Sequence, residues 1–139
     1  MAMVFEDAFM DAQANTVSLC MEFLEIAETD VDTVYIYFYI SEGMYFFNTF
    51  FKKGSKIIKP YSLTDKQGIR EFLHYGAEDA QNIQSVCKSY NKACPYEMKL
   101  VFETKTNKFD SKYRYEPLGE DESPTFRFLG WCDEIEKSL

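Results

Sequence analysis

The sequence predicts a single α+β domain over residues 1–139, with a mostly antiparallel sheet of about five strands and two main helices packed on one face. Two long stretches, residues 5–29 and 64–94, carry apolar side chains every three or four positions, as amphipathic helices do. Shorter runs between and after them alternate with the two-residue period of strands. A chain of 139 residues with 46% hydrophobic content can bury one core.

The first predicted helix begins at Phe5 and ends near Thr29. Its apolar stripe is long and regular, which is why we predict a helix here: Phe5, Ala8, Phe9, Ala12, Thr16, Leu19, Cys20, Phe23, Leu24 and Ala27. The acidic segment Asp30-Val31-Asp32 then connects this helix to the first strand.

Residues 34–51 predict a hairpin that is apolar on both faces, with its turn at Ser41-Glu42-Gly43. One face of the first strand is hydrocarbon, and the other carries the tyrosine row, which we define as Tyr35, Tyr37 and Tyr39. An antiparallel sheet normally buries one face and exposes the other to water. The tyrosine row is therefore either covered by the C-terminal segment, with Trp131 against the same face, or offered to a partner, which includes a second copy of this chain.

The second strand of the hairpin is predicted from Met44 to Lys52. A third follows from Ile57 to about Leu63, and Pro60 indicates that this strand lies at an edge or ends early, because proline cannot donate to a neighbouring strand. Thr64 and Gln67 then form a capping-box pattern, which predicts that the second helix begins there. Its stripe again has helical spacing: Ile69, Phe72, Leu73, Gly76, Ala80, Ile83, Cys87 and Tyr90. Gly76 weakens the middle of this helix by up to about 1 kcal/mol relative to alanine.

Cys94-Pro95 marks the exit from the second helix, and a second hairpin follows. Its strands are predicted at residues 96–104 and 108–116, and Phe109, Tyr113 and Tyr115 share one face of the second of them. A loop at residues 117–124 contains an acidic run. Residues 125–139 predict a short strand or turn that leads into a terminal helix with Trp131 and Ile135.

The distribution of charge indicates the class of partner. The net charge is -8, and the segments 1–32, 33–115 and 116–139 carry -8, +5 and -5. Nucleic acids and anionic membranes are bound through clustered Lys and Arg, so this acidic balance disfavours both. It favours a basic protein instead. No stretch reaches the roughly 20 apolar residues of a membrane span, and Glu6, Asp7 and Asp11 interrupt any signal sequence. We therefore expect a cytoplasmic protein.

The sequence lacks the usual patterns of catalytic and metal sites. The four cysteines, Cys20, Cys87, Cys94 and Cys132, form no Cys-x-x-Cys pair, so we expect reduced and mostly buried thiols. His74 is the only histidine, and neither a nucleophile nor an orienting acid accompanies it in a known pattern. We expect no enzyme, no cofactor and no metal.

Two stretches carry a recognisable pattern. Asp32 to Leu63 forms a strand that leads into an aromatic hairpin after the first helix, and Pro95 to Leu118 has a proline-led strand, a Lys-Phe turn exit and a Tyr-x-Tyr-Glu ending. In both stretches the chain resembles the YezG-like immunity proteins, small cytosolic bacterial proteins that bind and neutralise polymorphic toxins. The resemblance implies an inhibitor that binds a cognate secreted toxin, with a basic nuclease as one candidate. It implies no catalytic residues.

The acidic segments and the aromatic faces supply the candidate partner-binding residues: Tyr35, Tyr37, Tyr39, Tyr113, Tyr115, Asp30, Asp32, Glu120, Asp121 and Glu122. In this hypothesis charge speeds the encounter with a basic toxin and aromatic anchors hold the complex. The alternative is a small-ligand-binding or enzymatic α+β domain with an aromatic cleft between sheet and tail, which requires an enclosed pocket with convergent polar groups.

Overall fold

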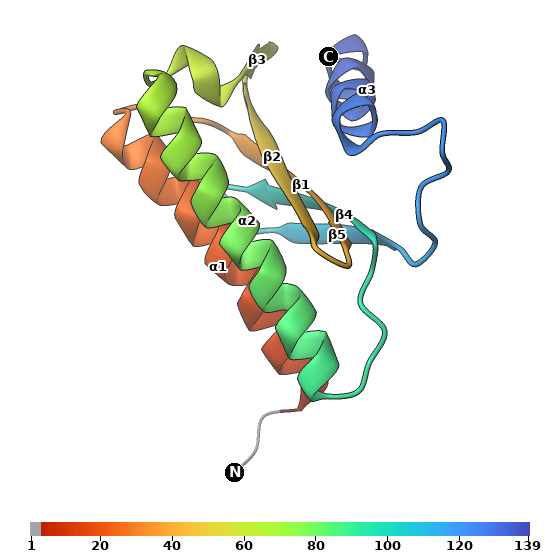
Figure 1. The fold of residues 1–139 in the computed structure, drawn as a ribbon. Helices are drawn as coiled ribbons and strands as arrows, with labels where there is room; N and C mark the ends of the chain where they lie inside the picture. The colour runs from red at the N-terminus through yellow and green to blue at the C-terminus, as the bar shows by residue number, and fades with distance from the viewer. Residues whose placement is uncertain (1–3) are drawn as a thin grey trace.

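The computed structural model describes residues 4–139 and has the α+β architecture that the sequence predicts. The elements follow one another as α1 (Phe5–Ile26), β1 (Thr33–Ser41), β2 (Met44–Lys53), β3 (Lys56–Ile58), α2 (Lys66–Ser89), β4 (Glu97–Glu103), β5 (Phe109–Arg114) and α3 (Pro124–Lys137). A 3-10 turn at Pro60–Ser62 precedes α2. The helices α1 and α2 lie side by side on one face of the sheet, and α3 lies on the opposite face (Figure 1).

The five strands form one sheet in the order β3-β2-β1-β4-β5, and every neighbouring pair is antiparallel. The long hairpin of β1 and β2 pairs from Ser41↔Met44 to Thr33↔Lys52, and β4 pairs with the other side of β1. Thr33 through Ile40 are all buried, because helices cover both faces of this central strand. The apolar character of both faces of β1 thus follows from its position in the sheet.

The main core lies between the sheet and the helices α1 and α2. The hydrocarbon face of β1 packs there, as predicted, with α1 and α2 contributing their apolar stripes. Its buried members include Leu24, Val34, Ile36, Phe38, Ile40, Phe51, Phe72, Ile83, Met98 and Leu100. Phe23 of α1 stacks on Phe72 of α2, with ring centroids 4.2 Å apart. These contacts fix the two helices against each other as well as against the sheet.

Several predicted boundaries were wrong. The helix α1 ends at Ile26 rather than near Thr29, and α3 begins at Pro124, where a loop followed by a short strand or turn was predicted. The third strand ends at Ile58, because the chain turns at Pro60–Ser62 before it enters α2. The helix α2 begins at Lys66, and its N-cap is Asp65 rather than Thr64: the Asp65 carboxylate accepts a hydrogen bond of 2.8 Å from the Gly68 amide. An aspartate carboxylate caps a free backbone amide as well as a threonine hydroxyl does, so the N-cap lies one residue after the predicted position. The predicted terminal helix is confirmed as α3.

Gly76 lets α2 approach the sheet closely. A Cβ atom at this position would lie 2.0 Å from Cδ2 of Phe47, whose ring is held between Phe38 and Phe72. The glycine therefore lowers helix propensity but permits the contact between α2 and β2.

We expect Gly76→Ala to lower the free energy of unfolding by about 1 kcal/mol. Overpacking of this kind costs about 1–3 kcal/mol and outweighs the gain of about 1 kcal/mol in helix propensity. Gly130→Ala is the matched control, because a Cβ at Gly130 in α3 meets no atom within 4 Å and should stabilise the protein slightly. Urea unfolding of both variants measures the difference. A neutral Gly76→Ala would show that the contact with Phe47 relaxes freely.

Candidate functional site

The tyrosine row is buried beneath α3. Tyr37 has no exposed surface, and Tyr35 and Tyr39 are 7% exposed. Trp131 of α3 meets Tyr35 edge-on at 5.6 Å between ring centroids, and the Tyr39 hydroxyl accepts a hydrogen bond from the Leu118 amide in the segment that leads to α3. The predicted covering of the tyrosine row by the C-terminal segment is therefore confirmed, and these three candidate partner-binding side chains are not exposed to a partner or to a second copy of the chain in this structure.

An ion pair attaches α3 to the sheet. Arg127 of α3 donates from Nε (2.9 Å) and Nη2 (2.7 Å) to the carboxylate of Glu97, which is also the acceptor for the Tyr37 hydroxyl at 2.6 Å. Burial opposes ionisation of Glu97, but the hydrogen bonds from Arg127 and Tyr37 outweigh it and lower the pKa of Glu97. Burial, together with the bond to Glu97, raises the pKa of Tyr37. This arrangement serves the fold, since its polar groups bind one another.

The two tyrosines of the last strand do not join the tyrosine row. Tyr113 lies on the opposite face of the sheet, where its ring packs 5.4 Å from that of Phe9 and its hydroxyl donates to Gln13 at 2.9 Å. Tyr115 follows the end of β5 and is exposed. Of the five candidate tyrosines, Tyr115 alone is open to a partner.

Two of the five candidate acids hold the fold together. Asp32 accepts a hydrogen bond of 2.7 Å from the Gly54 amide, which lowers the pKa of Asp32, and it lies 3.6 Å from Lys105. Glu122 lies 3.7 Å from Arg127 and 4.0 Å from Arg114. The remaining three, Asp30, Glu120 and Asp121, are exposed. They are available to a partner but are not gathered in a hollow.

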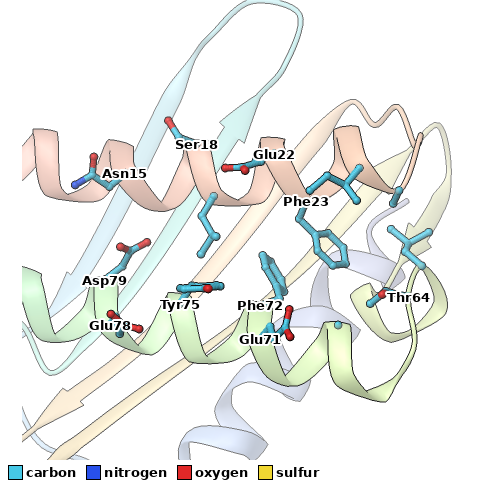
Figure 2. Close-up of a pocket in the computed structure, with 15 residues that line it drawn as sticks. Asn15, Ser18, Glu22, Phe23, Thr64, Glu71, Phe72, Tyr75, Glu78 and Asp79 are labelled. Carbon is cyan, nitrogen blue, oxygen red and sulfur yellow. The ribbon is translucent and has the colours of Figure 1, made fainter.

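A groove that bears charge lies between α1 and α2, on the side of the helices away from the sheet. It has a volume of about 740 Å³. Its carboxylates are Glu22, Glu71, Glu78 and Asp79, and no Lys or Arg is among its lining residues. We call it the acidic groove. Figure 2 shows Glu22 on α1 facing the α2 side chains across the hollow.

Apolar and aromatic side chains line the same groove. Phe23 and Phe72 form its floor at one end, and Tyr75 rises beside them with 54% of its surface exposed. Ile26 stands at the rim and is 78% exposed. A second hollow of about 850 Å³ on the other side of α1 shares Ile26, Glu22 and Ser18 with the groove. Carboxylates thus surround an exposed aromatic and aliphatic surface.

Asp79 is the most enclosed carboxylate of the groove. It accepts a hydrogen bond of 3.1 Å from the Thr16 hydroxyl, and burial raises its pKa, with a further contribution from the neighbouring Glu78. Glu78 in turn contacts the His74 ring nitrogen at 2.8 Å on the exposed surface. A cation that entered the groove would relieve the unfavourable ionisation of Asp79.

We expect Asp79→Asn to raise the free energy of unfolding at pH 7. The raised pKa means that the folded state binds the proton on Asp79 more tightly than the unfolded state does. Ionised Asp79 therefore destabilises the fold at pH values above 3.8, the ordinary pKa of an aspartate. The gain should shrink as pH falls through the folded pKa. Thermal unfolding between pH 7 and 4 measures it, with Asp11→Asn on the exposed face of α1 as the control. A gain independent of pH would contradict this account.

The sequence did not single out the acidic groove. The spacing of apolar residues predicts the stripes of both helices, but in the sequence Glu22, Glu71 and Asp79 contribute only to the overall acidic balance. The sequence pattern of the groove is a carboxylate next to the apolar stripe on each of two helices. This pattern indicates a shared site only once the two helices are known to pack against each other.

Comparisons with known proteins give no identity: no family model matches the chain, and no curated protein matches its sequence. Within residues 4–139, no group of three or more His, Cys, Asp or Glu side chains is placed to hold a metal ion. None of the three helices in this part of the chain is long and apolar enough to cross a membrane.

Proposed function

We propose that this chain is a cytosolic inhibitory binding protein, of the immunity type that it resembles, which neutralises a basic toxin by binding it through the acidic groove. One observation carries the proposal: the groove joins four carboxylates to an exposed aromatic surface with no Lys or Arg in its lining. A basic partner is the macromolecule that complements this surface.

The groove combines the two contributions that a tight inhibitor needs. Its carboxylates attract a basic surface over a distance of about 10 Å at moderate salt and so speed association. Tyr75 and the Phe23–Phe72 floor offer apolar area against which the aliphatic stems of Lys and Arg pack while their charged ends meet Glu22 and Glu71. Burial of such anchors lengthens the lifetime of the complex.

A nuclease is the toxin class that suits this surface best. An enzyme that cleaves nucleic acid binds phosphates with Lys and Arg, and an acidic protein can occupy the same basic surface. We therefore infer that the chain acts by covering its target and has no catalytic step of its own. The exposed pair of His74 and Glu78 has no nucleophile among the residues it contacts in the described part of the chain.

Capture of a toxin domain encoded beside this gene, together with protection of cells that express the toxin, tests the proposal. We expect the purified chain to bind the toxin domain with an association rate that falls as salt is raised. If the chain bound the toxin domain but did not protect the cells, the interaction would stand and the proposed inhibitory function would be wrong.

A small cationic ligand with an apolar part is the second candidate, because the volume of the groove lies within the range of ligand sites. Absence of capture, with binding of such a ligand instead, would favour this candidate.

A further inference from the structure

The strand β5 leaves one edge of the sheet open. It lies last in the strand order, and no other strand of residues 4–139 pairs with its outer side. The carbonyls of Lys108 and Arg114 point inward, because they accept hydrogen bonds of 2.9 Å and 2.8 Å from amides on the β4 side. Backbone groups alternate in direction along a strand, so the amides and carbonyls of Phe109, Ser111 and Tyr113 point outward. They form a row of donors and acceptors with which a further strand can pair.

The side chains of β5 complement those of a second, antiparallel copy of the same strand. With a two-fold axis beside Ser111, Asp110 lies opposite Lys112 of the second copy, and Lys112 lies opposite Asp110 of the second copy. Phe109 and Tyr113 are matched across the axis in the same way. Opposite charges and aromatic pairs are the cross-strand neighbours that stabilise an antiparallel sheet.

This register is the one near the middle of β5 that keeps like charges apart within the strand. Because the outward-pointing residues must face one another, the axis lies beside a residue and not between two. An axis beside Asp110 would bring two carboxylates together, and one beside Lys112 would bring two ammonium groups together. With the axis beside Ser111, the like-charged contact is between Lys108 and Arg114 of the second copy, and Lys108 lies outside β5.

The charges of β5 are incompletely matched within their own chain. Lys112 lies directly opposite Lys99 of β4, an unfavourable cross-strand pair. Asp110 lies 3.9 Å from Lys108, but 70% of its side chain remains exposed. A lysine on an edge strand usually deters pairing with another chain. Here a carboxylate from the second copy would offset the repulsion between Lys112 and Lys99.

An apolar stripe on α1 continues the same surface on the helix side of the sheet. Its four members recur at intervals of four, three and four residues and therefore share one side of the helix: Met10, Ala14, Val17 and Met21. Met10 is 44% exposed and Met21 is 37% exposed. Gln13 connects this side of α1 to β5, since its side-chain nitrogen lies 3.7 Å from the Met10 sulfur and its oxygen accepts from the Tyr113 hydroxyl. The two-fold axis would turn the stripes of two copies toward each other.

We propose that β5 is a self-association surface, through which two copies of this chain join their sheets edge to edge with the two-fold axis beside Ser111. The backbone groups of β5 supply the hydrogen bonds, the Asp110–Lys112 pairs set the register, and the stripes on α1 bury apolar area beside the joined strands. The acidic groove lies on the other side of α1, toward α2, so both copies keep it open. This inference is independent of the proposed function.

Sedimentation equilibrium of the purified full chain over a series of concentrations tests the proposal. We expect a reversible dimer. Lys112→Asp and Asp110→Lys should each raise its dissociation constant by at least a factor of about ten, because like charges then meet at two symmetric positions. The two substitutions change the net charge in opposite directions, so a common loss cannot come from net charge. The double variant Asp110→Lys/Lys112→Asp restores opposite charges in the same register and should dimerise as the wild type does.

Amide hydrogen exchange measured by NMR supplies a second readout. The amides of Phe109, Ser111 and Tyr113 should exchange more slowly in the dimer than in Lys112→Asp. Both exchanged side chains are exposed, and circular dichroism verifies that the variants fold. Three results would overturn the proposal: a monomer at every concentration, a dimer that neither single variant weakens, or a double variant that stays as weak as the single ones.

Discussion

Replacement of Arg127 by alanine is expected to lower the free energy of unfolding by about 3 kcal/mol and to loosen α3 from the sheet. The side chain of Glu97 is 5% exposed, and Arg127 supplies both hydrogen bonds that pair its charge. Removal of one partner leaves a buried carboxylate unpaired, which typically costs about 3–5 kcal/mol. Arg127 is itself one-third exposed, so we expect the lower end of that range.

Urea unfolding measures the loss, and hydrogen exchange locates it. Amides of α3 should exchange faster in Arg127→Ala, whereas Lys137→Ala, at the exposed end of the same helix, should match the wild type. Equal stability of the two variants would show that the apolar contacts of Phe128 and Trp131 alone hold α3 in place.

The pH dependence of this difference gives a second test. The pKa of Glu97 is lowered in the folded state. Ionised Glu97 therefore contributes its full stabilisation at pH values above 4.5, the ordinary pKa of a glutamate, and this stabilisation is lost as pH falls through the lowered pKa of the folded state. The gap between wild type and Arg127→Ala should therefore narrow in acid. A gap that is constant between pH 7 and 3 would assign the loss to packing of the Arg127 side chain instead.

The double variant Glu22→Lys/Glu71→Lys is expected to weaken binding to a basic toxin by at least a factor of about one hundred. The two residues lie on opposite walls of the acidic groove, and reversal of both replaces attraction by repulsion at its centre. A loss of this size, about 2.7 kcal/mol, is what hot-spot residues of an interface contribute. Both side chains are exposed, so the fold should tolerate the change.

Glu120→Lys/Asp121→Lys is the matched control, because it changes the net charge by the same amount in an exposed loop. Glu122 is left in place because it pairs with Arg127, and its reversal would also loosen α3. The loop variant should slow association without a large change in dissociation. Equal losses in both variants would mean that net charge alone, and not the groove, governs binding.

Much of the fold could be predicted because it depends on local patterns. The stripes of α1 and α2 have helical spacing, and the alternation in β1 and β2 with a turn at Glu42-Gly43 specifies a hairpin. The two apolar faces of β1 indicated that both faces of this strand are covered. The sequence did not decide whether α3 or a partner covers the tyrosine row. The apolar residues Trp131 and Phe128 are compatible with either arrangement.

The candidate site was harder to predict because it is a product of tertiary packing. Glu22 and Glu71 are far apart in the sequence, and each is unremarkable on its own helix. They face one another only because Phe23 stacks on Phe72 and fixes how the two helices meet. The role of Gly76 was likewise hidden, since its effect on the contact with Phe47 is opposite in sign to its helix propensity.

The most direct test of the proposed binding site is a hydrogen-exchange footprint of the complex between this chain and the basic toxin that we propose as its partner. We predict protection of residues 18–27 in and after α1 and residues 68–79 in α2, where the walls of the acidic groove lie. The exchange of α3 should be unchanged, because the tyrosine row stays covered. Protection confined to residues 115–123 or to the face that α3 covers would contradict the groove as the binding site.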